Sequence, residues 1–488
     1  MIAGLFKDMS KYLPANIIPA LVGIITIPVV TRLFPPGEYG NYVLVWATVS
    51  VLGVIVGWLP MAVIRFFPAY ERDSRLGEFY GTVLSLATLS IGIVFLIFLG
   101  LIYLCKNLIS RDLYLLMRIG SLVFVINAFF EILAYLLRIK RRAGWYSTFF
   151  AWKSIASLSL GLVLILLLGL GVEGLLWGVV FSTALTFPFL WKVALGKPLA
   201  EIRRFSLPLS SSMAKYGFPL AAGNLAAWIL SLSDRYILEF FRGTHEVGIY
   251  SVSYDISSKT VLLILTLFAL ASGPIEMNIW ERQGEQASQE FLTKLTRSYI
   301  LICIPAVVGL SALARPIITI LTAHEYYEGY RIIHLVTAGA FFLGLQQRYQ
   351  SGLLFYKKTY YVTFSILASG LLNLCLNLLF IPKYGYFAAA ATTFLSYGFL
   401  LAIIIVISRR FFVWNFPFQT LARVIIASTV MAVIVYRVGN SLTSSTCANL
   451  IMATCIGMMV YFLILLVTKE FSREEIRSLS LYRKKVFT

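Results

Sequence analysis

One stretch of this 488-residue chain, Tyr12–Tyr42, reads YLPANIIPALVGIITIPVVTRLFPPGEYGNY. It opens with about twenty apolar or small residues, enough at a rise of about 1.5 Å per residue to cross a bilayer. Pro14, Pro19 and Pro28 lie inside this run, where neighbouring helices of a membrane bundle can satisfy the freed carbonyl groups. Arg32 closes the run before a Pro-Pro-Gly turn. The stretch therefore predicts a first membrane-spanning helix that ends in an arginine.

The same pattern recurs in the second half of the chain. Tyr216 opens another small-residue helix, and Asp234 and Arg235 close it. Gly248-Ile249-Tyr250 then follows, as Gly40-Asn41-Tyr42 follows the first helix, at an offset of roughly 204 to 208 residues. Later segments correspond at roughly 214 to 215 residues. Two related membrane halves are typical of transporters with two lobes and a binding site between them.

The composition excludes a soluble protein. Hydrophobic residues make up 59% of the chain and charged residues 13%, which indicates a multi-pass membrane protein. The formal net charge of +19 fits the positive-inside rule, so nucleic-acid binding gains little support from it. The five cysteines are scattered without a CxxC motif, so we expect neither a disulfide framework nor a metal site, and no cofactor.

Hydropathy predicts fourteen spans with both termini on the cytoplasmic side. With that orientation the cytoplasmic segments carry 29 lysines and arginines and the outer loops carry 10. The predicted spans are 12–33, 40–64, 81–104, 115–137, 147–169, 173–194, 216–240, 248–272, 297–314, 331–352, 359–381, 386–407, 419–438 and 446–468.

The repeat divides the chain into an N-terminal lobe (1–200), a C-terminal lobe (201–410) and a final segment (411–488) with two extra helices and a basic tail. We expect 273–296 to form a polar amphipathic helix weakened at Gly284. The tail opens with the capping box Ser472-Arg-Glu-Glu475, which predicts an amphipathic helix on the inner leaflet or a frayed, solvated end.

No motif predicts an enzyme. Gly169–Gly174 spells GxGxxG, but it joins two predicted spans with no strand before it, so dinucleotide binding is excluded by context. The chain has no GxxxxGK[ST] motif and no nucleophile–base arrangement.

Ionisable residues at membrane depth are costly, so each is a candidate functional residue. Lys153 either binds ligand or extends to the headgroups. Asp255 and Lys259 stand four apart and can pair on one helical face, as a structural ion pair or as ligand contacts. Cations outnumber acids in this set, which favours a phosphate-bearing ligand. The remaining candidates are Glu131 and Arg138, seven apart on one helix face, and Arg65 and Arg348 at span ends.

Several short motifs together resemble a known family. They are Thr31-Arg32-Leu-Phe, Glu38-Tyr-Gly-Asn-Tyr42, Arg65-Phe-Phe-Pro, Asp234-Arg235-Tyr-Ile-Leu and Tyr384-Gly-Tyr-Phe-Ala-Ala. The chain resembles the polysaccharide (O-antigen) flippase branch of the multidrug/oligosaccharidyl-lipid/polysaccharide exporter superfamily. One departure is Phe387, where that branch favours glycine.

The resemblance implies two six-helix lobes arranged as a V, two peripheral C-terminal helices, and a location in the cytoplasmic membrane of a bacterium or archaeon. It also implies alternating access that moves an undecaprenyl-pyrophosphate-linked glycan to the outer leaflet. Arg32, Arg65 and Arg235 would line the cavity, while a polysaccharide polymerase and a chain-length regulator would be partners. We assign coupling or gating to the carboxylates of Glu131, Asp234 and Asp255.

Three alternatives stay open. A drug or small-cation antiporter of the same superfamily would favour acids in its cavity. A membrane polysaccharide polymerase or glycosyltransferase would need a long outer loop with polar catalytic residues. A scaffold for a glycan-assembly complex would leave the intramembrane charges unexplained.

Overall fold

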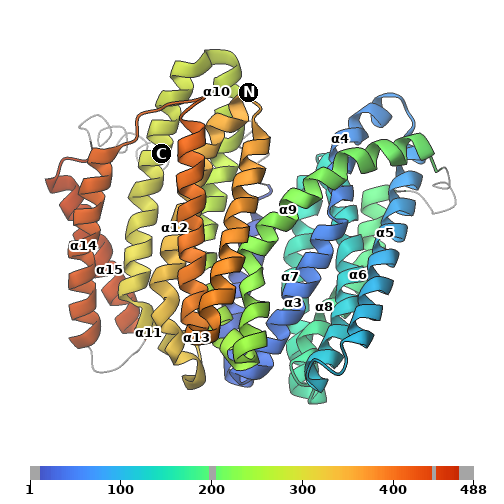
Figure 1. Cartoon of the computed structure of the whole chain (residues 1–488), viewed down its shortest axis with the longest axis horizontal. Helices are drawn as coiled ribbons and strands as arrows, with labels where there is room; N and C mark the ends of the chain where they lie inside the picture. Colours follow the sequence, from blue (N-terminus) through green and yellow to red (C-terminus); the bar gives the residue numbers. More distant parts are fainter. Residues whose placement is uncertain (1–10, 197–204, 442–446, 472–488) are drawn as a thin grey trace, which may run out of the picture. The chain divides into compact units, whose positions relative to one another are not determined.

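The computed structural model describes residues 11–196, 205–441 and 447–471, and within them the chain is all-helical (Figure 1). The predicted tail helix, which begins at Ser472, lies outside these residues. The helices are α2 (Pro14–Leu33), α3 (Pro36–Val56), α4 (Trp58–Arg72), α5 (Leu76–Leu104), α6 (Arg111–Ile139), α7 (Ala143–Leu168), α8 (Glu173–Leu195), α9 (Leu207–Arg242), α10 (Thr244–Ala312), α11 (Ala314–Leu321), the 3-10 helix η2 (His324–Ile332), α12 (Ile333–Phe355), α13 (Thr359–Ser408), α14 (Phe418–Ser441) and α15 (Cys447–Val467).

All fourteen predicted spans fall on these helices. Among the described residues, 11 helical segments are long and apolar enough to cross a membrane. α10 and α13 each contain two predicted spans, and each bends at a glycine with positive φ, Gly284 at 81° and Gly385 at 59°. The expected weak point in 273–296 is therefore a real break in helical geometry, since glycine adopts positive φ without a steric penalty.

The helices form two compact units. Unit 1 comprises residues 1–252 and 363–392, and unit 2 comprises 253–362 and 393–488. These units group the chain by contact, whereas the predicted lobes group it by sequence repeat. The repeat-based division stays a prediction.

In unit 1, the first turns of α3 and α10 touch backbone to backbone. A Cβ atom added at Gly40 would collide with the carbonyl oxygen of Thr244, and one added at Gly248 would collide with that of Pro36. Gly40 and Gly248 are the matching glycines of the sequence repeat. The repeated glycine thus allows two corresponding helix starts to pack at a distance that a side chain would forbid.

Two other glycine contacts tighten unit 1. A Cβ at Gly178 on α8 would lie 2.5 Å from the backbone nitrogen of Gly161 on α7. A Cβ at Gly217 on α9 would lie 2.6 Å from the carbonyl oxygen of Trp58 on α4. Small residues that let helix backbones approach closely are the usual basis of packing inside a membrane.

In unit 2, α14 and α15 run side by side (Figure 1), and a buried carboxylate ties them to α10. Glu470 accepts hydrogen bonds from Arg297 at 2.9 Å, Arg423 at 3.0 Å and Thr420 at 2.6 Å. Burial alone would raise the pKa of the Glu470 carboxyl, but these hydrogen bonds lower it below its usual value. The stabilisation is therefore present at neutral pH and is lost as pH falls through the lowered pKa.

The glycine contact predicts the effect of adding one methyl group. We expect Gly40→Ala and Gly248→Ala each to destabilise the purified protein by roughly 1–3 kcal/mol, because the new Cβ overpacks against backbone. Gly92→Ala, on α5 with nothing within 4 Å of the added Cβ, is the matched control and should be neutral or stabilising. The measurement is the thermal unfolding midpoint. Equal midpoints for all three variants would contradict the close approach.

Candidate functional site

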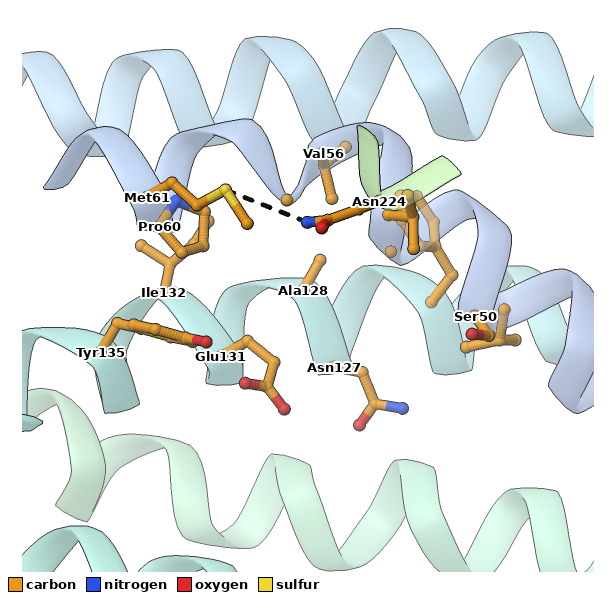
Figure 2. A pocket seen from close by; sticks show the side chains of 15 residues that line it. Ser50, Val56, Pro60, Met61, Asn127, Ala128, Glu131, Ile132, Tyr135 and Asn224 are labelled. Atoms are coloured by element: carbon orange, nitrogen blue, oxygen red, sulfur yellow. Dashed lines mark hydrogen bonds between the residues drawn. The ribbon is translucent and has the colours of Figure 1, made fainter. Parts of the chain in front are cut away.

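A cavity of about 310 Å³ lies inside unit 1 between α3, α4, α6 and α9 (Figure 2). Asn127, Glu131 and Tyr135 stand four residues apart on α6 and so present one polar face to it. Asn224 on α9 and Ser50 on α3 complete the polar lining. Glu131 was predicted from sequence as a membrane-depth acid, and the structure places it on the wall of a cavity.

The polar lining of this cavity is rich in hydrogen-bond acceptors. Figure 2 shows the side chains of Asn127 and Glu131 next to each other and pointing the same way. The Oδ1 atom of Asn127 is buried and has no hydrogen-bond partner within the described residues. Asn224 makes only a weak contact, from its Nδ2 atom to the sulfur of Met61 at 3.9 Å. The cavity can therefore accept hydrogen bonds from a ligand or a cation.

A second, smaller cavity of about 210 Å³ contains Lys153, which was also predicted from sequence. α2, α3, α7 and α8 line it, with Ser154 and Ser157 beside the lysine. The Lys153 ammonium lies over the ring of Phe130 on α6, 4.2 Å from its centroid. The charges of Lys153 and Glu131 also act on each other. The lysine is thus held at membrane depth by an aromatic face and an acid on the neighbouring helix.

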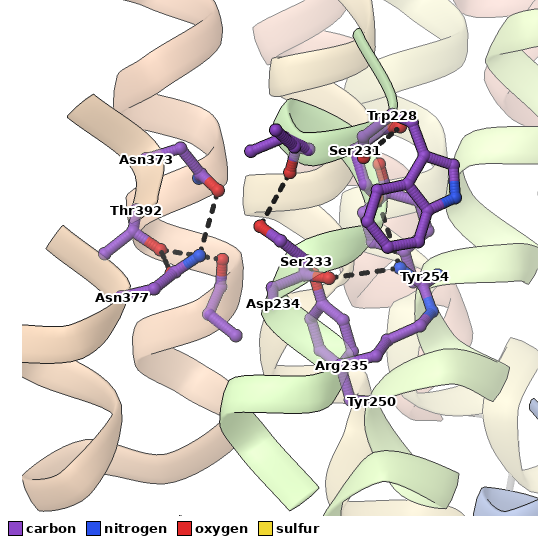
Figure 3. A network of polar contacts seen from close by, with 12 residues as sticks. Trp228, Ser231, Ser233, Asp234, Arg235, Tyr250, Tyr254, Asn373, Asn377 and Thr392 are labelled. Carbon is purple, nitrogen blue, oxygen red and sulfur yellow. Dashed lines mark hydrogen bonds and ion pairs between the residues drawn. The ribbon is translucent and has the colours of Figure 1, made fainter. Parts of the chain in front are cut away.

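Asp234 and Arg235 are fully inside unit 1, at 1% and 3% exposure (Figure 3). The Arg235 Nη1 atom lies 3.2 Å from Asp234 Oδ1 and 3.2 Å from the carbonyl oxygen of Ser231. Tyr250 donates a hydrogen bond to the other carboxylate oxygen, and its ring lies 5.5 Å below the guanidinium. Asp234 and Arg235 lie near the end of α9 and Tyr250 lies near the start of α10, so this buried group joins two consecutive helices.

The other predicted arginines of unit 1 are exposed. Arg32 lies in the last turn of α2, Arg65 on α4, and Arg138 near the end of α6, where it stacks over Tyr135 at 5.8 Å. Exposed positions leave these guanidinium groups accessible to an anion. That these arginines line one substrate site stays a prediction.

In unit 2, both predicted groups form ion pairs. Lys259 lies 2.7 Å from Asp255, four residues apart on α10, and both side chains are partly exposed. Arg348 on α12 is buried and lies 3.2 Å from Glu276 on α10. Ser351 donates to the same carboxylate at 2.8 Å.

Sequence reasoning missed three polar groups. Glu276 lies in the stretch expected to be a polar amphipathic helix, so its burial beside Arg348 was not anticipated. Asn373, Asn377 and Thr392 form a buried network on α13 (Figure 3), although the two asparagines stand four apart in an apolar run and could have been noticed. Glu470 follows the last predicted span. A carboxylate at such a position is usually exposed, so the sequence did not indicate that Glu470 is buried.

Comparison with known proteins identifies relatives of this chain. A family described as "Polysaccharide biosynthesis protein" matches residues 29–330. The succinoglycan biosynthesis transport protein ExoT of Rhizobium meliloti is 22% identical over 323 residues, 64% of this chain and 61% of that protein. An uncharacterized membrane protein of Methanocaldococcus jannaschii, MJ1068, is 27% identical over 197 residues, 40% of this chain and 38% of that protein. The chain thus aligns with less than two thirds of either relative.

Solved structures show the same fold at low sequence identity. The lipid II flippase MurJ in an inward closed conformation superposes with a TM-score of 0.75 at 18% identity, over 93% of this chain and 97% of that one. An inward-facing MATE family multidrug resistance transporter superposes at 0.64 and 12% identity, over 83% and 93%. The predicted all-helical exporter fold is confirmed, and the proteins of known function in this comparison are transporters rather than enzymes.

The Asp255–Lys259 contact generates a test of its role. Removing one partner of an ion pair at membrane depth leaves an unpaired charge, so Asp255→Asn or Lys259→Gln alone should lower protein abundance. The double variant should restore abundance if the pair is structural. If the double variant is abundant but does not transport, the pair also contacts ligand. Fully abundant and active single variants would contradict both interpretations.

Proposed function

The chain belongs to the polysaccharide biosynthesis protein family, and from that premise we propose that it is a lipid-linked oligosaccharide flippase. It moves an undecaprenyl-pyrophosphate-linked glycan from the cytoplasmic to the outer leaflet of the cytoplasmic membrane by alternating access, with both termini in the cytoplasm. The glycan serves the assembly of a surface polysaccharide such as O-antigen, capsule or exopolysaccharide. A polysaccharide polymerase and a chain-length regulator are its proposed partners.

One observation carries this proposal: a polysaccharide biosynthesis family match lies on a chain with the fold of a lipid II flippase. The relative ExoT, a succinoglycan biosynthesis transport protein, supports the same substrate class.

Pyrophosphate recognition calls for cations that can reach the ligand. Arg32, Arg65 and Arg138 are exposed, and Lys153 lines a cavity, so a phosphate group can reach these four side chains. Arg235 is buried and paired with the carboxylate of Asp234, and Arg348 is buried and paired with that of Glu276. Lys259 is paired with Asp255. For these three cations, contact with substrate requires that phosphate replace the carboxylate.

Such an exchange supplies a gating mechanism. Binding can drive a conformational change only if the ligand interacts more strongly with one state than with the other. A phosphate that takes the cation from Asp234 or Asp255 leaves a carboxylate that needs a new partner. We propose that these acids, with Glu131, set the energy difference between the inward and outward states.

A second candidate function is a drug or small-cation antiporter. The acceptor-rich cavity around Glu131 and Asn127 favours it, because an acid with neighbouring oxygen acceptors suits a cation. A flippase and an antiporter differ in the molecule that moves, so a transport phenotype separates them.

The test is complementation of a strain that lacks its glycan flippase. Wild-type protein should restore surface glycan, Arg32→Ala should abolish it, and Arg32→Lys should be intermediate, because lysine keeps the charge but loses the planar fork. The same order is expected at Arg235, where abundance must be measured in parallel because Arg235→Ala also unpairs the buried Asp234.

Arg111→Ala, at the exposed start of α6, is the matched control and should display glycan normally. Wild-type display from Arg32→Ala and Arg65→Ala at normal abundance would contradict the cation assignment. Failure of the wild-type chain to restore glycan, with increased resistance to cationic drugs, would favour the antiporter.

A further inference from the structure

The largest of the cavities described here has no role in the proposed transport cycle. It encloses about 720 Å³ in unit 1, at the end where α3, α6 and α8 begin. Glu38, Asp112 and Glu173 line it, one from the first turn of each helix. An acid in a first turn ordinarily stabilises the positive end of its own helix, so the acids alone identify no ligand.

Asn41 supplies independent evidence for a ligand. Its side chain lines the same cavity and is only 8% exposed, yet its Oδ1 atom has no hydrogen-bond partner within the described residues. A buried carbonyl oxygen without a donor is costly. The missing partner must be an N–H or O–H donor, because an acceptor oxygen cannot bond to another acceptor.

None of the three acids forms a salt bridge within the described residues. The Glu38 carboxyl experiences the charges of both Glu173 and Asp112, so like charges are held near one another. Arg118 lines the same cavity, but in the part of the chain that the structure describes it forms no salt bridge with any of the three acids. Its guanidinium instead lies over Tyr114, 6.0 Å from the ring centroid. The cavity thus contains a cation and a group of acids that do not neutralise each other.

The remaining wall is apolar. Phe95 and Leu99 on α5, Leu115 and Leu122 on α6, and Trp177 on α8 line it. The side chains of Leu115 and Leu122 are 45% and 42% exposed, so this wall is open at the protein surface rather than sealed inside the helix bundle. A ligand that fits all three surfaces has a cationic donor, an anionic group and an apolar tail.

We propose that this cavity is a binding site for an aminophospholipid with a primary ammonium headgroup. The ammonium donates hydrogen bonds to the acids and to Asn41, the phosphate contacts Arg118, and an acyl chain lies along the apolar wall. A choline headgroup carries the same charge but has no N–H donor, and a glycerol headgroup lacks the cation. The site is separate from the proposed glycan pathway, so it stands whether or not the chain is a flippase.

Native mass spectrometry of the delipidated, full-length protein tests this site. Phosphatidylethanolamine, phosphatidylcholine and phosphatidylglycerol with identical acyl chains are added in equal amounts. We expect about tenfold preferential retention of phosphatidylethanolamine, the size expected for one charge-assisted hydrogen bond. The double variant Glu38→Gln/Asp112→Asn should lose this preference, and Arg118→Gln should weaken retention of all three lipids.

Glu325→Gln and Arg315→Gln are matched controls, since both positions are exposed and neither lines the cavity. They should bind like the wild type. Equal retention of phosphatidylethanolamine and phosphatidylcholine by the wild type would overturn the proposal. A preference for phosphatidylglycerol, or an unchanged preference in the double variant, would overturn it as well.

Discussion

The contact between the starts of α3 and α10 leaves less room for a Cβ atom than any other glycine contact in the described part of unit 1. Gly40 and Gly248 bring two backbones together where neither position has room for a Cβ atom. Close backbone contact matters in a membrane because lipid tails are as apolar as the side chains, so burial of apolar surface gives little drive for helix association. Asn41 and Tyr250, which follow these glycines within two residues, are both buried. The repeated Gly-x-Tyr pattern therefore places a helix contact and the polar groups beside it.

The polar and charged side chains at membrane depth are of two kinds. Asp234 pairs with Arg235 and Tyr250, and Glu276 pairs with Arg348 and Ser351, so each of these buried charges has a partner of opposite charge. Glu131 on α6 and Lys153 on α7 instead line cavities. The first kind holds helices together in one state, and the second kind leaves capacity for a ligand. The proposed transport cycle uses the difference between them.

Much of the fold was predictable because it depends on local properties. The fourteen spans predicted from hydropathy all fall on helices, and Gly284 marked a break in α10. The i,i+4 spacing of Asp255 and Lys259 correctly implied their ion pair. What sequence could not give were partners from distant segments. The sequence around Arg348 does not predict its ion pair with Glu276, and the sequence around Glu470 does not predict its ion pair with Arg297. Packing alone brings these residues together. The same limit hid the cavity formed by the starts of α3, α6 and α8.

The central claim is that this chain moves a pyrophosphate-linked glycan across the bilayer. The most direct measurement uses purified protein in liposomes that contain a defined undecaprenyl-pyrophosphate-linked oligosaccharide, with the glycan on the far leaflet detected by an impermeant lectin. The account predicts protein-dependent appearance of the glycan, at a rate that falls when free undecaprenyl pyrophosphate competes. Liposomes in which the glycan stays in its original leaflet, while the same protein moves an organic cation against a gradient, would contradict it.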